Sequence, residues 1–203
     1  MAMLMGAVKV VQGINNAQLK NASVDPKYMN WTYDDYVNGD VPTIIDFVKN
    51  RTGKDKAHWV GHSMGGNILL CYLTQNPKAN NDIVSIFTAG SQLTMKKGTV
   101  MNNQLKNLEA TRLLELKGGD ISKAKEISQD TNYKMFFNTS NADPRIVDQL
   151  NAIGSDTPSM GVLGQYMNLS DTGKYASNDK KVDYTDDAGN IKVPAFYSAG
   201  RKD

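Results

Sequence analysis

The chain has 203 residues, of which 40% are hydrophobic and 22% charged, the composition of an ordinary folded protein rather than of a disordered one. The formal net charge is +2 and the lysine pairs are isolated, so nucleic acid is not an expected partner. Cys71 is the only cysteine, which excludes an internal disulfide, and no apolar run approaches the roughly 20 residues of a membrane-spanning helix. The apolar residues 1–8 lack the features of a signal peptide, and the compartment stays open.

Two helices are predicted near the start of the chain. The first begins at Thr32, because Asp35 three residues later completes an acidic variant of the capping box. The second begins near Asp40, tolerates Pro42 in its first turn and ends at Gly53. Its predicted apolar stripe consists of Val41, Ile44, Ile45 and Val48.

A strand, a helix and a second strand follow these helices. Residues 57–60 form a short apolar run bounded by glycine, residues 64–75 have helical periodicity, and residues 83–87 are again a strand pattern. A strand–helix–strand unit of this length makes the two strands parallel, and parallel sheets are covered by helices. The predicted fold class is therefore α/β.

The next hundred residues are mostly helical. Helices are predicted at residues 101–117, 120–129 and 143–154. In the last of these, Asp143 is the expected N-cap and Pro144 the first helical residue. A strand at residues 193–198 then returns the chain to the sheet. We therefore predict that residues 91–190 form a helical lid inserted into one domain that spans residues 1–203.

The segment Gly61-His62-Ser63-Met64-Gly65 carries the chemistry. A Gly-x-Ser-x-Gly pattern alone recurs by chance, but here it lies between a buried strand and an amphipathic helix, where a nucleophile elbow needs it. Such a turn holds Ser63 in a strained conformation, exposed at the carboxyl end of the sheet. Side chains at Gly61 and Gly65 are expected to collide with neighbouring backbone, and Gly66 to allow close packing of the helix. The alternative is an ordinary glycine-rich turn.

The start of the following helix supplies a second catalytic element. The backbone N–H of Met64 has no partner within the helix and is the expected oxyanion donor. No metal site is indicated, since two histidines and one cysteine offer no ligand cluster.

Several segments together resemble one protein family. They are Trp31–Tyr36, Asp40–Pro42, Ile45–Val48, Thr52–Gly53 and His58–Gly66. These segments resemble the acid-lipase branch (gastric or lysosomal type) of the α/β hydrolases and its bacterial lipase relatives. The resemblance is strong over residues 31–75, returns weakly at 165–179 and again near 193–203, and is poor over residues 1–30. It implies hydrolysis of small-molecule esters or acyl lipids through an acyl-enzyme, without a cofactor, and contact of the lid with a lipid interface.

The resemblance also implies an acid and a base for Ser63. In this fold the order along the chain is serine, acid, histidine. Asp203, in a Gly-x-x-Asp turn, is the implied acid, the alternative being a solvated carboxylate. His58 and His62 both precede Ser63 and fit neither the order nor the geometry of a general base.

The expected histidine therefore lies downstream of Asp203. With few strands before Trp31, the sequence is interpreted as an incomplete α/β-hydrolase fold that leaves apolar sheet faces uncovered and has little activity of its own. Two alternatives stay open. One is an acyltransferase that uses the same acyl-enzyme, and the other is a non-catalytic relative that binds a lipid or a protein.

Overall fold

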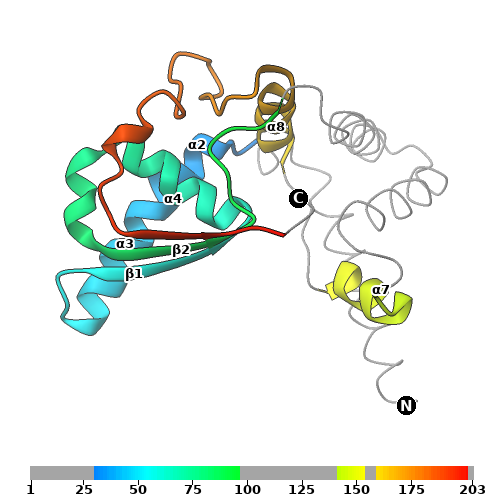
Figure 1. The fold of residues 1–203 in the computed structure, drawn as a ribbon, viewed down its shortest axis with the longest axis horizontal. Coiled ribbons are helices and arrows are strands. Elements are labelled where there is room, and N and C mark those ends of the chain that lie inside the picture. The colour runs from blue at the N-terminus through cyan, green and yellow to red at the C-terminus, as the bar shows by residue number, and fades with distance from the viewer. Residues whose placement is uncertain (1–29, 97–140, 154–158, 201–203) are drawn as a thin grey trace. The chain divides into compact units, whose positions relative to one another are not determined.

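The computed structural model describes residues 30–96, 141–153 and 159–200, drawn in colour in Figure 1. The residues of ranges 31–96 and 161–200 belong to one compact unit, which contains the sheet. Helix α7 belongs to a second unit and is described by itself. Within the described ranges, no helix has the length and apolar character needed to cross a membrane.

The sheet has three parallel strands in the order β1-β2-β3, with bounds Ala57–His62, Ile83–Ala89 and Ala195–Ser198. Helix α4 (Met64–Gln75) and the 3-10 turn η3 (Pro77–Asp82) connect β1 to β2. Helix α4 has the predicted bounds, and β1 and β2 run two residues further than predicted. The α/β class and the parallel pairing are therefore confirmed.

The first helical region is one continuous stretch rather than two helices. It consists of α2 (Tyr33–Asp35), the π-helical turn η2 (Tyr36–Asp40) and α3 (Val41–Thr52). The carboxylate of Asp35 accepts hydrogen bonds from the N–H (2.6 Å) and the hydroxyl (2.8 Å) of Thr32. Pro42 has no N–H to donate, so the backbone hydrogen bonds of the helix are already interrupted there. The π-helical turn, which is wider than an α-helical one, lies next to this interruption.

Helix α4 forms the centre of the hydrophobic core. Its buried apolar residues are Ile68, Leu69, Leu70, Cys71 and Leu73. Val37, Val41 and Ile45, each four positions apart, are buried in the same cluster. Ile44 and Val48 are 46% and 37% exposed, so half of the predicted stripe lies outside the core. The helix buries a narrower strip than its sequence pattern indicates.

The last part of the chain packs on the same core. It contains α8 (Met160–Thr172) and the 3-10 turn η4 (Ala188–Asn190). The carboxylate of Asp34 accepts hydrogen bonds from the amide of Gln165 (3.1 Å) and the hydroxyl of Tyr184 (2.6 Å). A charged acceptor shared by two distant segments fixes the region after α8 to the start of the helical layer.

Helix α7 (Pro144–Ile153) begins where its sequence predicts. Asp143 Oδ1 accepts the backbone N–H of Arg145 at 2.9 Å, which makes Asp143 the N-cap. The helices predicted at 101–117 and 120–129 lie outside the described residues. The lid over residues 91–190 and the single domain over 1–203 accordingly stay predictions.

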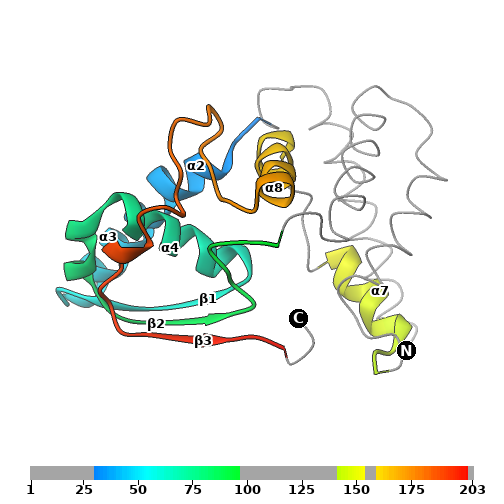
Figure 2. The same ribbon diagram turned by 45° about the horizontal axis from the view of Figure 1, so that its top comes forward.

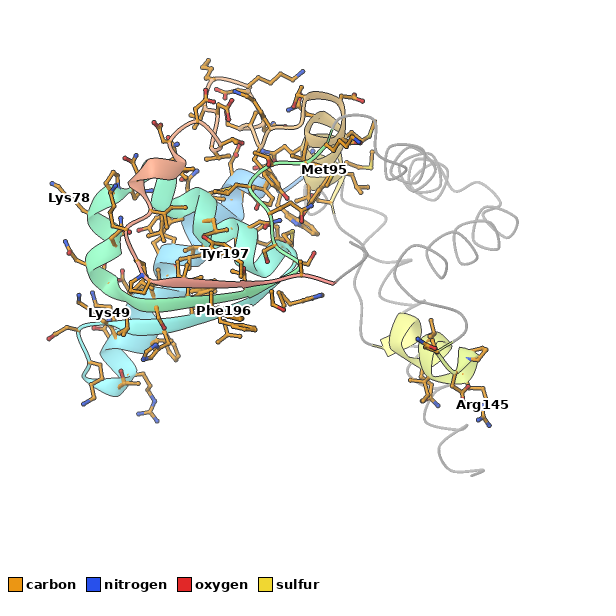
Figure 3. The ribbon with its side chains drawn as sticks, in the orientation of Figure 1. Lys49, Lys78, Met95, Arg145, Phe196 and Tyr197 are labelled. Atoms are coloured by element: carbon orange, nitrogen blue, oxygen red, sulfur yellow. The ribbon has the colours of Figure 1, made fainter. Side chains whose placement is uncertain are left out.

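Helices cover only one face of the sheet among the described elements, with α2, α3 and α4 on the same side in Figure 2. On the other face, Val60, Phe87 and Phe196 form a row across the three strands and are 76%, 39% and 63% exposed. The rings of Phe87 and Phe196 stack at 5.5 Å. Figure 3 shows Phe196 and Tyr197 on opposite sides of β3. An apolar row therefore faces outward.

Candidate active site at Ser63

Ser63 stands between the last residue of β1 and the first residue of α4, with φ 50° and ψ −122°. This is the left-handed half of conformational space, which costs a non-glycine residue about 1–3 kcal/mol. The side chain is exposed at the carboxyl end of the parallel sheet, where ligands bind in open α/β folds. The predicted strained, exposed serine is what the structure contains.

Hydrogen bonds hold both backbone groups of Ser63. Its N–H donates to the carbonyl of Ala89 at 2.8 Å. Its carbonyl accepts the backbone N–H groups of Gly66 (3.1 Å) and Asn67 (3.2 Å) and the hydroxyl of Ser91 (2.8 Å). The end of the neighbouring strand and the start of the helix therefore fix the residue from both sides.

The three glycines of the turn have different functions. A Cβ on Gly61 would lie 2.5 Å from the Cα and N of Gly66, so the backbone passes too closely for any side chain. A Cβ on Gly66 would lie 2.3 Å from Ser91 Oγ and 2.8 Å from Thr88 Cγ2. A Cβ on Gly65 would meet nothing within 4 Å, so the prediction of a collision there is wrong. Gly61 and Gly66 make the close approach of strand and helix.

Two backbone donors lie beside the serine. Met64 and Gly65 are the first two residues of α4, and among the described residues neither N–H has an acceptor. Unpaired N–H groups at a helix start carry partial positive charge and suit a developing oxyanion. The indole N–H of Trp59 donates to the carbonyl of Gly65 at 2.9 Å and steadies this first turn. The structure therefore places an exposed serine beside two unpaired N–H groups at the start of a helix.

The other residues considered from the sequence lie elsewhere. His58 Nδ1 is 2.8 Å from Ser85 Oγ, so this histidine is hydrogen-bonded to the neighbouring strand, and its side chain is exposed. His62 is exposed at the end of β1. No side chain of the described ranges forms a hydrogen bond with Ser63 Oγ. Asp203 lies outside the described residues, so its role as the acid stays a prediction.

Helix α4 also contains the thiol of Cys71. It is fully buried in α4, and its Sγ lies 3.9 Å from the hydroxyl of Tyr33. Burial raises the pKa of the thiol to about 12, so it stays protonated at neutral pH. Across the described ranges, no group of three or more His, Cys, Asp or Glu side chains is arranged to hold a metal ion.

Trp59 and Ser91 were not predicted from the sequence to contact this turn. Trp59 reads as a core residue of a strand, and nothing in the local pattern shows that its N–H reaches the helix. Ser91 follows β2 by two residues, at the carboxyl end of the strand next to β1. That edge is where functional residues of parallel sheets gather, and this topological signal alone points to Ser91.

Comparison with protein families gives one match over most of the chain. A model described as alpha/beta hydrolase fold matches residues 19–203.

Among curated proteins, the chain is 30% identical to human lipase member N over 78 residues. It is 30% identical to bovine gastric triacylglycerol lipase over 80 residues, and 31% identical to human lysosomal acid lipase/cholesteryl ester hydrolase over 64 residues. These alignments cover 38%, 39% and 32% of the chain, but only 20%, 20% and 16% of the respective relatives.

Similarity over most of the chain also extends to a solved structure. It comes from a study of carboxylesterases of the thaumarchaeon Nitrososphaera gargenis. The TM-score is 0.50 at 15% sequence identity, and the alignment covers 85% of this chain and 55% of that chain. At this identity the likeness concerns the fold.

Proposed function

We propose that this chain, which belongs to the α/β-hydrolase family, carries the nucleophile of a serine carboxylic-ester hydrolase. The observation that carries the proposal is the conformation of Ser63, a strained and exposed serine at the start of a helix. Strained backbone conformations cluster at active sites, and a nucleophile elbow has one at its serine. The lipase names of the curated relatives support the same class of reaction.

The proposed reaction has two steps. Ser63 Oγ attacks the ester carbonyl carbon while its proton passes to a base. The carbonyl oxygen becomes an oxyanion, which accepts a hydrogen bond from the N–H of Met64. Collapse of this intermediate breaks the ester C–O bond, and the alcohol leaves with the proton. Water then attacks the acyl-enzyme in the same way and releases the acid. We propose that the carboxylate of Asp203 orients a histidine and that this histidine is the base.

The proposed substrates are esters with hydrophobic acyl chains. The relatives carry the names triacylglycerol lipase and cholesteryl ester hydrolase, and both describe water-insoluble acyl esters. The lid proposed for residues 91–190 would cover the acyl chain and contact the lipid interface. No part of this chemistry calls for a cofactor.

One observation favours a second function, a non-catalytic relative that binds a lipid or a protein. Among the described residues, Ser63 has oxyanion donors beside it but no base hydrogen-bonded to it. A hydrolase fold in this state retains the shape of the site without the proton transfer that turnover needs.

Covalent labelling with a fluorophosphonate probe, with and without added imidazole, tests these functions. Imidazole acts as a diffusible base, so we expect slow labelling of Ser63 that imidazole accelerates about tenfold or more. Mass spectrometry locates the adduct, and Ser63→Ala is the control. Fast labelling without imidazole would show that the chain contains its own base. Absence of labelling under both conditions would exclude the hydrolase and favour the binding protein.

The same acyl-enzyme permits transfer to an alcohol in place of water. Product analysis with a p-nitrophenyl ester and an added alcohol distinguishes the two acceptors. We expect free acid as the main product, whereas a predominance of the new ester would identify an acyltransferase.

A further inference from the structure

The hydroxyl of Ser91 reaches the backbone of the proposed nucleophile from a neighbouring segment. It donates to the carbonyl of Ser63 at 2.8 Å, and it lies 3.4 Å from the carbonyl of Ala89. A hydroxyl has one proton, and the shorter contact takes it. Ala89 meanwhile accepts the N–H of Ser63 at 2.8 Å. Ala89, the last residue of β2, and Ser91, two residues beyond it, therefore hold the two backbone groups of the strained residue.

Ser91 lies close to helix α4. A Cβ on Gly66 would lie 2.3 Å from Ser91 Oγ and 2.8 Å from its Cβ, so the serine occupies the space left by the missing side chain. This close approach keeps the hydroxyl of Ser91 beside the first turn of the helix, where it bonds Ser63.

The carbonyl of Ser63 and the N–H of Met64 belong to the same peptide group. Because that group is planar and trans, fixing the direction of the oxygen also fixes the direction of the N–H. A hydrogen bond to the oxygen further polarises the N–H on the other side of the peptide. The hydroxyl of Ser91 therefore acts on the oxyanion donor through one rigid unit, without contacting the substrate.

We propose that Ser91 is a positioning residue that orients the Ser63–Met64 peptide and so aims the N–H of Met64 at the oxyanion. The proposal rests on the function proposed for Ser63. It adds a residue outside the Gly-x-Ser-x-Gly segment whose hydroxyl sets the strength of the oxyanion donor.

A thiol placed at position 63 measures this effect without substrate or base. In the variant Ser63→Cys, the thiolate is an anion beside the N–H of Met64. The rate of alkylation by iodoacetamide, measured as a function of pH, should therefore have its midpoint below about 8.5, the pKa of a free thiol. The native thiol of Cys71 is buried, with its pKa raised to about 12, and does not compete in the folded protein.

Removing the hydroxyl should weaken this stabilisation of the thiolate. With Ser91→Ala in the Ser63→Cys background, we expect the midpoint to rise by about half a pH unit or more, a roughly threefold lower thiolate fraction below the midpoint. The matched control is Ser85→Ala, which removes a hydroxyl of the same sheet that bonds His58 rather than Ser63. The control should leave the midpoint unchanged. An equal midpoint in the Ser91→Ala and Ser91 proteins overturns the proposal.

A second pair of variants applies if Ser91→Ala does not fold. Ser91→Thr and Ser91→Val have nearly the same volume and differ only in the hydroxyl, so the crowding against Gly66 is the same in both. The proposal expects the lower midpoint for threonine, and equal midpoints contradict it. The alkylation profile is independent of fluorophosphonate labelling. If the fluorophosphonate does not label Ser63, the proposed hydrolase is rejected. If Ser63 is labelled but the Ser91 variants leave the pH profile of alkylation unchanged, only the role of Ser91 is rejected.

Discussion

At the scale of single residues, the site is a strained serine, and hydrogen bonds from neighbouring residues offset the free energy of the strain. The conformation of Ser63 costs about 1–3 kcal/mol, and each of its four backbone hydrogen bonds returns about 0.5–1.5 kcal/mol. The bonds form only if strand and helix approach closely. That approach depends on Gly61 and Gly66, not on Gly65.

Adjacent glycines in the first turn of α4 make a matched test of this difference. Gly66→Ala places a methyl group 2.3 Å from Ser91 Oγ, so we expect a loss of about 1–3 kcal/mol in the free energy of unfolding. Gly65→Ala meets nothing within 4 Å, and alanine favours a helix over glycine, so its effect should be between neutral and about 1 kcal/mol stabilising. Urea unfolding of both variants measures the difference. Equal destabilisation would contradict the packing argument.

At the scale of elements, a cluster of tyrosines connects three segments to α4. Asn67 donates to the hydroxyl of Tyr175 at 2.6 Å, and the rings of Tyr33 and Tyr175 stack at 5.4 Å. Tyr166 contacts both rings edge-on. Burial raises the pKa of all three hydroxyls, that of Tyr166 to about 12. The cluster anchors the helix whose first turn forms the site.

Alkaline titration tests the burial of this cluster. Because the tyrosine pKa values are higher in the folded chain than the value near 10 of the unfolded chain, their contribution to stability is complete below about pH 10 and is lost above it. Each buried tyrosine should lower the free energy of unfolding by about 1.4 kcal/mol per pH unit there. Chemical unfolding between about pH 9 and 11.5 measures the slope. Tyr175→Phe should make it shallower, and an unchanged slope would show that Tyr175 ionises in the folded chain.

The elements themselves were largely predictable from the sequence. Helix α4 and the parallel strands follow from periodicity and glycine boundaries, which are local signals. The π-helical turn at residues 36–40 was not predictable, because the local periodicity does not distinguish it from an ordinary helical turn. The exposure of Ile44 and the bond from Ser91 to Ser63 were equally hidden. Both depend on which segments lie side by side, and a single sequence does not display that.

At the scale of the whole molecule, the alignments with lipase member N, gastric triacylglycerol lipase and lysosomal acid lipase cover only 16–20% of those proteins, and helices cover one face of the described sheet. Parallel sheets are normally covered on both faces, because their strands are apolar on both. Among the described residues, the row of Val60, Phe87 and Phe196 on the other face is thus exposed apolar surface. Such surfaces promote self-association.

A charge placed in this row separates exposure from burial. Val60 is 76% exposed, so Val60→Lys should change the free energy of unfolding by less than about 1 kcal/mol and should reduce self-association in light scattering. Ile86→Lys is the control, because Ile86 is 2% exposed on the helix-covered side of the next strand and an unpaired charge there should unfold the protein. If Val60→Lys instead costs about 2 kcal/mol or more, position 60 is buried in solution. A loss of stability that depends on protein concentration would then identify a second copy of the chain as the cover, and a loss independent of concentration would place the cover within the chain.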